Sequence, residues 1–146
     1  MGPIVVGYDG REESELALQR ALSEAARRKL PVVVLIVGEL PVDPVNPLEP
    51  GEPAFTSLME ITEDGPVTVK PIVDAARRVL AEAGVQGRVE WTLGDPASEI
   101  VRFADDCDAT AIVVGTHHHS ALGRLFGADI AAAVIRHAGR DVIVAQ

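Results

Sequence analysis

The chain has 146 residues, and its 13 Lys plus Arg stand against 22 Asp plus Glu, which gives a formal charge of −9. This charge disfavours contact with a nucleic-acid backbone or an anionic membrane, so we expect neither partner. The length and the 47% hydrophobic content fit one globular domain over residues 1–146. Because the sequence has no signal-peptide pattern and no apolar run of spanning length, we expect a cytoplasmic protein.

Short apolar runs alternate with stretches of helical periodicity. The run from Pro3 to Tyr8 predicts a buried strand, and residues 11–29 carry apolar side chains at the spacing of one helix face. Asp9 is placed to cap or precede that helix. The wholly apolar run from Val32 to Val37 predicts a second buried strand.

The acidity is concentrated in an insert at residues 39–66. This stretch holds seven acidic residues, no Lys or Arg, and six of the ten prolines. Proline at every third position from Pro41 to Pro53 favours extended polyproline II backbone, and a short helical turn is possible from Phe55 to Met59. We interpret the insert as a mobile linker or lid; a docking motif of the P-x-x-P type is the alternative.

The second half continues the alternation. Residues 69–83 predict a helix that Gly84 ends, and the more alternating run from Arg88 to Leu93 predicts an edge strand. Asp95 and Pro96 form a strong helix start, for a helix that runs to about Asp106. The remaining predicted elements are a strand at 111–114, a helix at 127–137 and a last strand at 142–144.

This order predicts an α/β fold with a five-stranded, doubly wound parallel sheet and helices on both faces. Right-handed crossovers favour the spatial strand order 3-2-1-4-5, which reverses between the first and fourth strands. Ligands bind such sheets at the carboxyl ends of the strands beside the reversal.

The tetrapeptide IVVG occurs twice, at Ile4–Gly7 and Ile112–Gly115, in the two strands that flank the reversal. Gly7 and Gly115 have no side chain, so a ligand could approach the strand ends closely. The alternative is that both glycines are ordinary strand ends.

Three segments carry a resemblance to a known family. IVVGYDGREES begins the chain, GDPASEIVRFADDCDATAIVVGT lies in its second half, and GTHHHSALGRLFGADIAAAVIRHAGRDVIV nearly completes it. In order and spacing the chain resembles a single-domain universal stress protein from end to end, apart from the acidic insert. The resemblance implies the adenine-nucleotide alpha-hydrolase-like version of the fold, a stress-linked binding function and a homodimer.

The resemblance also implies cofactor-binding positions for ATP or another adenine nucleotide. Asp9 matches the acidic residue that holds the nucleoside, and Val37 matches the position that lines the adenine. In the closing phosphate loop, the two residues that match the family's glycines are Gly115 and, with one residue fewer in between, Gly127.

The phosphate side of this pattern is altered in the chain. His118 replaces a glycine and would crowd a phosphate, Ala128 lacks the expected hydroxyl, and Asp129 adds a negative charge. Arg124 is the only Lys or Arg of the loop. We therefore expect a vestigial pocket, or one that takes a nucleoside or a less charged nucleotide. The alternatives are an ordinary ATP-binding universal stress protein and an interaction module without nucleotide, which would use the acidic insert.

Other candidates for chemistry are weak. The run His117–His119 invites a metal interpretation, but in an extended loop His117 and His119 point one way and His118 the other. Asp129 and Asp9 are the acids that could lie nearby, and we predict no metal site. Cys107 stands among acids, which predicts a half-buried packing residue. No catalytic motif is present and we expect no enzyme, with a small-molecule hydrolase as the alternative. The last strand, Val142 to Val144, predicts an edge that pairs with a second copy.

Overall fold

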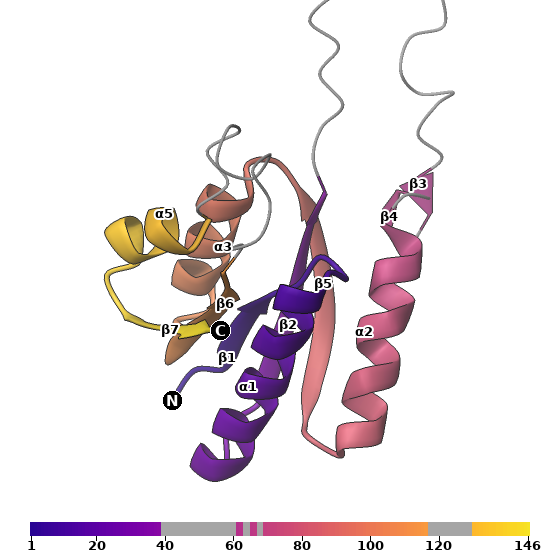
Figure 1. The fold of residues 1–146 in the computed structure, drawn as a ribbon, viewed down its shortest axis with the longest axis horizontal. Coiled ribbons are helices and arrows are strands. Elements are labelled where there is room, and N and C mark those ends of the chain that lie inside the picture. Colours follow the sequence, from indigo (N-terminus) through magenta and orange to yellow (C-terminus); the bar gives the residue numbers. More distant parts are fainter. Residues whose placement is uncertain (39–60, 63–64, 67–68, 117–129) are drawn as a thin grey trace, which may run out of the picture.

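The computed structural model describes residues 1–38, 61–62, 65–66, 69–116 and 130–146 of the chain. A five-stranded parallel sheet has the order β5-β2-β1-β6-β7 (Figure 1). In chain order this is 3-2-1-4-5, so the predicted topology is confirmed. Its strands are β1 (Ile4–Gly7), β2 (Val32–Gly38), β5 (Gly87–Leu93), β6 (Ala111–Gly115) and β7 (Asp141–Ala145).

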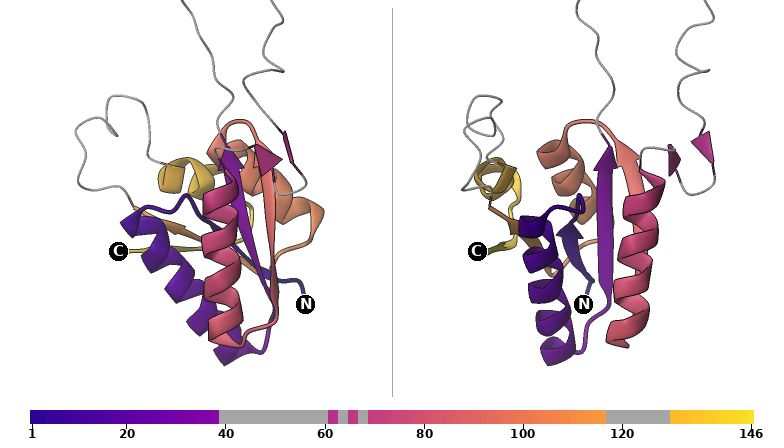
Figure 2. Two further views of the ribbon diagram at one scale, coloured as in Figure 1. Left: turned by 90° about the vertical axis from the view of Figure 1, so that its right-hand side faces the viewer. Right: turned by 45° about the vertical axis from the view of Figure 1, so that its right-hand side comes forward.

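Helices cover both faces of the sheet. Helices α1 and α2 lie on one face, and α3 and α5 lie on the other (Figure 2). Their bounds are α1 (Glu12–Arg28), α2 (Lys70–Ala83), α3 (Pro96–Asp106) and α5 (Ile130–His137). The part of the predicted last helix at residues 127–129 lies outside the described residues.

The sheet separates two hydrophobic cores. Along β2, Val32, Val34 and Ile36 pack with α1 and α2, whereas Val33 and Leu35 pack with α3 and α5. All five side chains are essentially inaccessible to solvent. Alternate residues of a strand face opposite sides of a sheet, so a strand buried on both sides must be apolar throughout. This requirement explains the uninterrupted valine-rich runs of the sequence.

The predicted helix ends have the expected geometry. Asp95 caps α3, because its carboxylate accepts a hydrogen bond of 3.0 Å from the backbone N–H of Ser98. The hydroxyl of Ser98 donates a second hydrogen bond to the same carboxylate, and the two bonds lower the pKa of Asp95. Gly84 ends α2 with φ at +66°, the left-handed conformation that glycine adopts most easily.

Part of the acidic insert forms a small antiparallel pair that the sequence pattern does not predict. Strand β3 (Ile61–Thr62) pairs with β4 (Gly65–Pro66), close to the start of α2. The possible helical turn at 55–59 and the proline-rich run lie outside the described residues. No helix among the described residues is long and apolar enough to cross a membrane.

Candidate functional site

A cavity of about 570 Å³ lies where the strand order reverses, at the carboxyl ends of β1, β2 and β6. The amino-terminal turns of α1, α3 and α5 and the start of α2 contribute to its wall. The predicted site residues Asp9, Val37 and Gly115 all line it. The other lining residues are Gly7, Tyr8, Arg11, Glu13, Ser14, Leu35, Gly38, Val69, Ile72, Pro96, Ile100, Val114 and Ile130.

The turn between β1 and α1 holds Asp9 in the wall of the cavity. Gly10 has φ at +83°, and this left-handed residue turns the chain into the helix. The carboxylate of Asp9 accepts a hydrogen bond of 2.9 Å from the backbone N–H of Arg11. Ser14 closes the turn, since its hydroxyl accepts from the Asp9 N–H at 3.2 Å and donates to the Arg11 carbonyl at 3.0 Å. Asp9 therefore precedes α1, and the residue at the N-cap position is Arg11.

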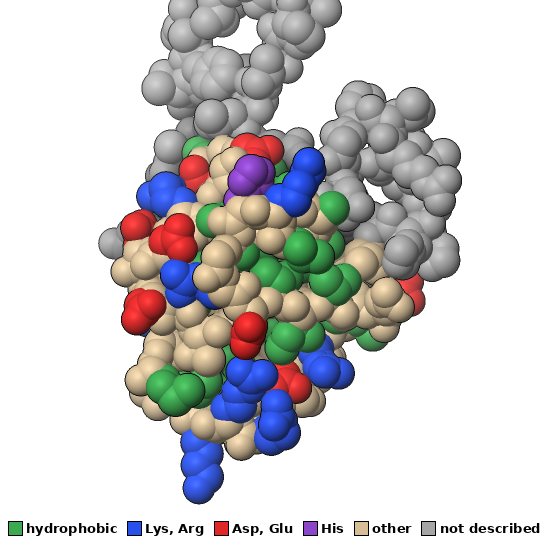
Figure 3. Space-filling view, turned by 90° about the vertical axis from the view of Figure 1, so that its left-hand side faces the viewer, with side chains coloured by type: hydrophobic (Ala, Val, Ile, Leu, Met, Phe, Trp, Pro, Cys, Tyr) green, Lys and Arg blue, Asp and Glu red, His purple; other side chains and the backbone are tan. Residues whose placement is uncertain are grey.

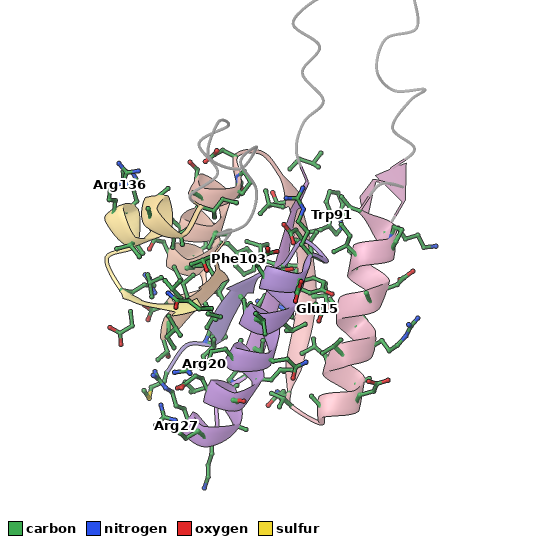
Figure 4. All side chains as sticks on the ribbon, viewed as in Figure 1. Glu15, Arg20, Arg27, Trp91, Phe103 and Arg136 are labelled. Atoms are coloured by element: carbon green, nitrogen blue, oxygen red, sulfur yellow. The ribbon has the colours of Figure 1, made fainter. Side chains whose placement is uncertain are left out.

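Buried Tyr8 and half-buried Glu15 form a hydrogen-bonded pair next to this turn. The Tyr8 hydroxyl donates a hydrogen bond of 2.5 Å to Oε1 of Glu15, which lies at the upper end of α1 in Figure 4. Tyr8 is 3% exposed, and burial, the hydrogen bond to Glu15 and nearby negative charge all raise its pKa. The phenol therefore stays protonated at physiological pH, and it fixes the first turn of the helix against the sheet. No sequence pattern predicts this pair, because the contact depends on how α1 is positioned against the end of β1.

The two glycines of the IVVG repeats have packing roles. A Cβ atom at Gly115 would lie 2.3 Å from the backbone oxygen of Glu13, so the first turn of α1 crosses directly over the end of β6. A Cβ at Gly7 would lie 2.8 Å from Cδ1 of Ile100. Their lack of a side chain thus lets α1 and α3 approach the strand ends, and the same residues line the cavity.

The wall of the cavity combines an apolar side with a charged side. Val37 lies near the end of β2, and the side chains of Val69, Ile72 and Ile100 supply further apolar surface. The charged lining residues among those described are Asp9, Glu13 and Arg11. The Nε atom of Arg11 is 3.8 Å from Oδ2 of Asp9, and their side chains are 72% and 41% exposed. The cavity can therefore take a partly apolar ligand that carries hydrogen-bond donors.

The remaining predicted positions are His118, Gly127 and Ala128, which lie outside the described residues, as do Arg124, Asp129 and the three consecutive histidines. Among the residues that the structure describes, no three His, Cys, Asp or Glu side chains come together as a metal site would require. Cys107 is half-buried against the core of α3 and α5, and burial is the main cause that raises its thiol pKa. It packs there as predicted and does not line the cavity.

A doubly wound α/β protein with a ligand-sized cleft at the strand reversal is the class that this fold and cavity define. The sequence model of the Universal stress protein family matches residues 1–146, and the chain belongs to this family. A universal stress protein of Methanocaldococcus jannaschii is 31% identical over 143 residues, which are 98% of this chain and 81% of that protein. The predicted family membership is confirmed.

Solved structures of this family share the fold. A universal stress protein from Archaeoglobus fulgidus has a TM-score of 0.72 and 28% identity, with 100% of this chain and 99% of that chain covered. The universal stress protein from Archaeoglobus fulgidus in complex with dAMP has a TM-score of 0.67 and 28% identity, covering 100% and 98%. A universal stress protein in complex with cAMP also shares the fold, with a TM-score of 0.70 and 23% identity. The match covers 99% of this chain and 97% of that chain.

Proposed function

We propose that this universal stress protein is a regulatory binding protein whose cleft takes an adenine nucleoside or a nucleotide with few phosphates. The observation that carries the proposal is that Asp9, Val37 and Gly115, from three different strand ends, line one cavity. Its volume of about 570 Å³ lies within the range of cavities that bind small ligands. A relative of 28% identity is described in complex with dAMP, a monophosphate, which supports this ligand class.

The charge of the wall favours a ligand with little negative charge. Asp9 and Glu13 face one cation, Arg11, among the described lining residues. A triphosphate would add repulsion with each further phosphate, and in the loop that follows β6 the residues His118, Ala128 and Asp129 offer fewer donors than the family pattern. We infer that ATP binds more weakly than a monophosphate.

We also propose a homodimer that pairs through β7 and a protein without catalytic turnover. Val142, Ile143 and Val144 are only half-buried in this edge strand, and Figure 3 shows hydrophobic side chains gathered on the face that includes α5 and β7. An uncovered apolar edge is a surface for pairing with a second copy.

The ligand proposal is tested on protein purified without added nucleotide. After denaturation, mass spectrometry of the released small molecules should identify an adenosine compound, and the emptied protein should bind AMP saturably by calorimetry. A protein that releases no nucleotide and shows no saturable binding of adenosine or AMP would support the interaction-module alternative instead.

A further inference from the structure

Arg11 occupies a helix position that its side chain does not suit. It is the N-cap residue of α1, where Ser, Thr, Asp or Asn would accept a hydrogen bond from the first turn, and it makes no such bond. Its positive charge also lies at the positive end of the dipole of a 17-residue helix. Residues that break local rules in this way concentrate at functional sites.

The position of Arg11 places this charge at the cavity. Arg11 lines the cavity beside Asp9, and the 3.8 Å separation of Nε and Oδ2 is longer than a hydrogen bond. With its side chain 72% exposed, the guanidinium can turn toward a ligand without breaking a buried contact. Arg11 is the cation among the described lining residues, so an anionic group bound next to Asp9 would lie within reach of its guanidinium.

We propose that Arg11 is the specificity-determining residue that recognises the phosphate of a nucleoside monophosphate in this cleft, an inference that rests on the function proposed above. The planar guanidinium fork matches the oxygens of a phosphate and can donate two parallel hydrogen bonds. When Arg11 pairs with the phosphate, Oδ2 of Asp9 loses its cationic neighbour and accepts a hydrogen bond from the nucleoside. Oδ1 of Asp9 keeps its bond from the backbone N–H of Arg11, so the turn is unchanged.

The acidic first turn of α1 limits how much phosphate this arrangement accepts. The first turn holds Glu12, Glu13 and Glu15, and of these three it is Glu13 that lines the cavity. One phosphate monoester is matched by Arg11, whereas a second or third would add negative charge to a cavity that Glu13 also lines. The site therefore binds a nucleoside monophosphate more tightly than it binds either the nucleoside or the triphosphate.

The test compares adenosine and AMP binding by calorimetry in the wild type, Arg11→Gln and Arg11→Lys. We expect the wild type to bind AMP about tenfold more tightly than adenosine, which is the effect of one charge-assisted contact. Arg11→Gln keeps most of the side-chain length without the charge, so AMP should bind no more than about twofold more tightly than adenosine, whose own affinity stays unchanged. Arg11→Lys keeps the charge without the fork and should retain part of the preference.

Arg88→Gln is the matched control. Arg88 is also an exposed arginine, 3.1 Å from a carboxylate two residues away, but it does not line the cavity. It should keep the full preference for AMP. Arg11→Ser adds a readout that does not depend on ligand: it supplies the missing cap and should unfold at a higher denaturant concentration than the wild type.

The outcomes separate the two proposals. If neither adenosine nor AMP binds the wild type, the proposed function fails and this inference with it. If both bind, but Arg11→Gln keeps the tenfold preference or weakens both ligands equally, the proposed function stands and the role of Arg11 is wrong. A loss of preference in Arg88→Gln would likewise contradict it.

Discussion

At the scale of single residues, the site depends on side chains that hold backbone turns as well as a ligand. Asp9 accepts from the Arg11 N–H, and Ser14 links Asp9 to the same turn. Among the described residues, the Arg11 guanidinium lies next to Oδ2 of Asp9, with its Nε 3.8 Å away. One oxygen of the carboxylate therefore orders the turn, while the other lies beside Arg11 in the wall of the cavity.

Asp9→Asn should weaken AMP binding about tenfold, or about 1.4 kcal/mol, because it replaces a charged acceptor with a neutral one. Asparagine also suits such turns, so the free energy of unfolding should change little. Calorimetry on this variant and on Asp74→Asn, an exposed residue of α2 away from the cavity, makes the comparison. Equal affinities for all three proteins would remove Asp9 from the site.

Gly115→Ala should lower the free energy of unfolding by about 2 kcal/mol, because its Cβ would meet backbone that cannot rotate away. Gly7→Ala is the paired case, since its Cβ would meet the tip of the flexible Ile100 side chain, and it should cost less, about 1 kcal/mol. Urea denaturation of both variants gives the two values. A cost for Gly115→Ala that is no larger than that for Gly7→Ala contradicts the proposed crossing of α1 over β6.

At the scale of elements, the apolar runs and the helix signals predict the sheet and its order. Residues 32–37 allow little besides a doubly buried strand, and Asp95-Pro96 allows little besides a helix start. Right-handed crossovers then bring Asp9, Val37 and Gly115 to one edge. The Tyr8–Glu15 pair, the unsuitable cap at Arg11 and the contact of Gly115 with Glu13 depend on the depth and rotation of α1 against the sheet. Sequence periodicity does not specify this depth and rotation, so it does not predict this part of the site.

The cap of α3 makes stability depend on pH. Asp95→Ala should cost about 1 kcal/mol at pH 7, because the Ser98 N–H loses its partner. The folded-state pKa of Asp95 is lowered, so its contribution is complete above the unfolded-state value near 4 and is lost as the pH falls through the folded-state pKa. The stability difference between wild type and Asp95→Ala should therefore shrink in acid, as urea denaturation at pH 7 and pH 3 would measure.

Asp95→Asn is the control for this prediction. Asparagine caps a helix as well as aspartate does, but it does not titrate. The free energy of unfolding of this variant should match that of the wild type at pH 7, and its advantage over Asp95→Ala should persist in acid. A wild type and Asp95→Ala pair that differ equally at both pH values would show that the carboxylate charge is not involved.

At the scale of the whole molecule, the two edges of the sheet differ in environment. Strand β5 forms one edge beside α2, whereas β7 forms the other edge, with three half-buried apolar residues. Light scattering at tens of micromolar should give the mass of a dimer. Val142→Lys should shift it toward the monomer, because a charge would be buried in the paired edge.

Val89→Lys is the matched control, since Val89 is also a half-buried valine, on the opposite edge strand. It should leave the dimer intact. A monomeric wild type, or equal dissociation of the two variants, would overturn pairing through β7.

The charge of −9 is also a property of the whole molecule, and its largest share belongs to residues 39–66. The remaining chain is close to neutral, with 15 acidic and 13 basic residues. Outside residues 39–66, the net charge of the chain therefore repels an anionic ligand only weakly. The preference for AMP over ATP must come from the charged groups that line the cleft.

The preference of this cleft for few phosphates is tested by a calorimetric competition between AMP and ATP for the emptied wild-type protein, without added metal. We predict micromolar binding of AMP and binding of ATP at least tenfold weaker, because Asp9 and Glu13 oppose the additional charge. ATP that binds as tightly as AMP would contradict this preference and make the chain an ordinary ATP-binding member of its family.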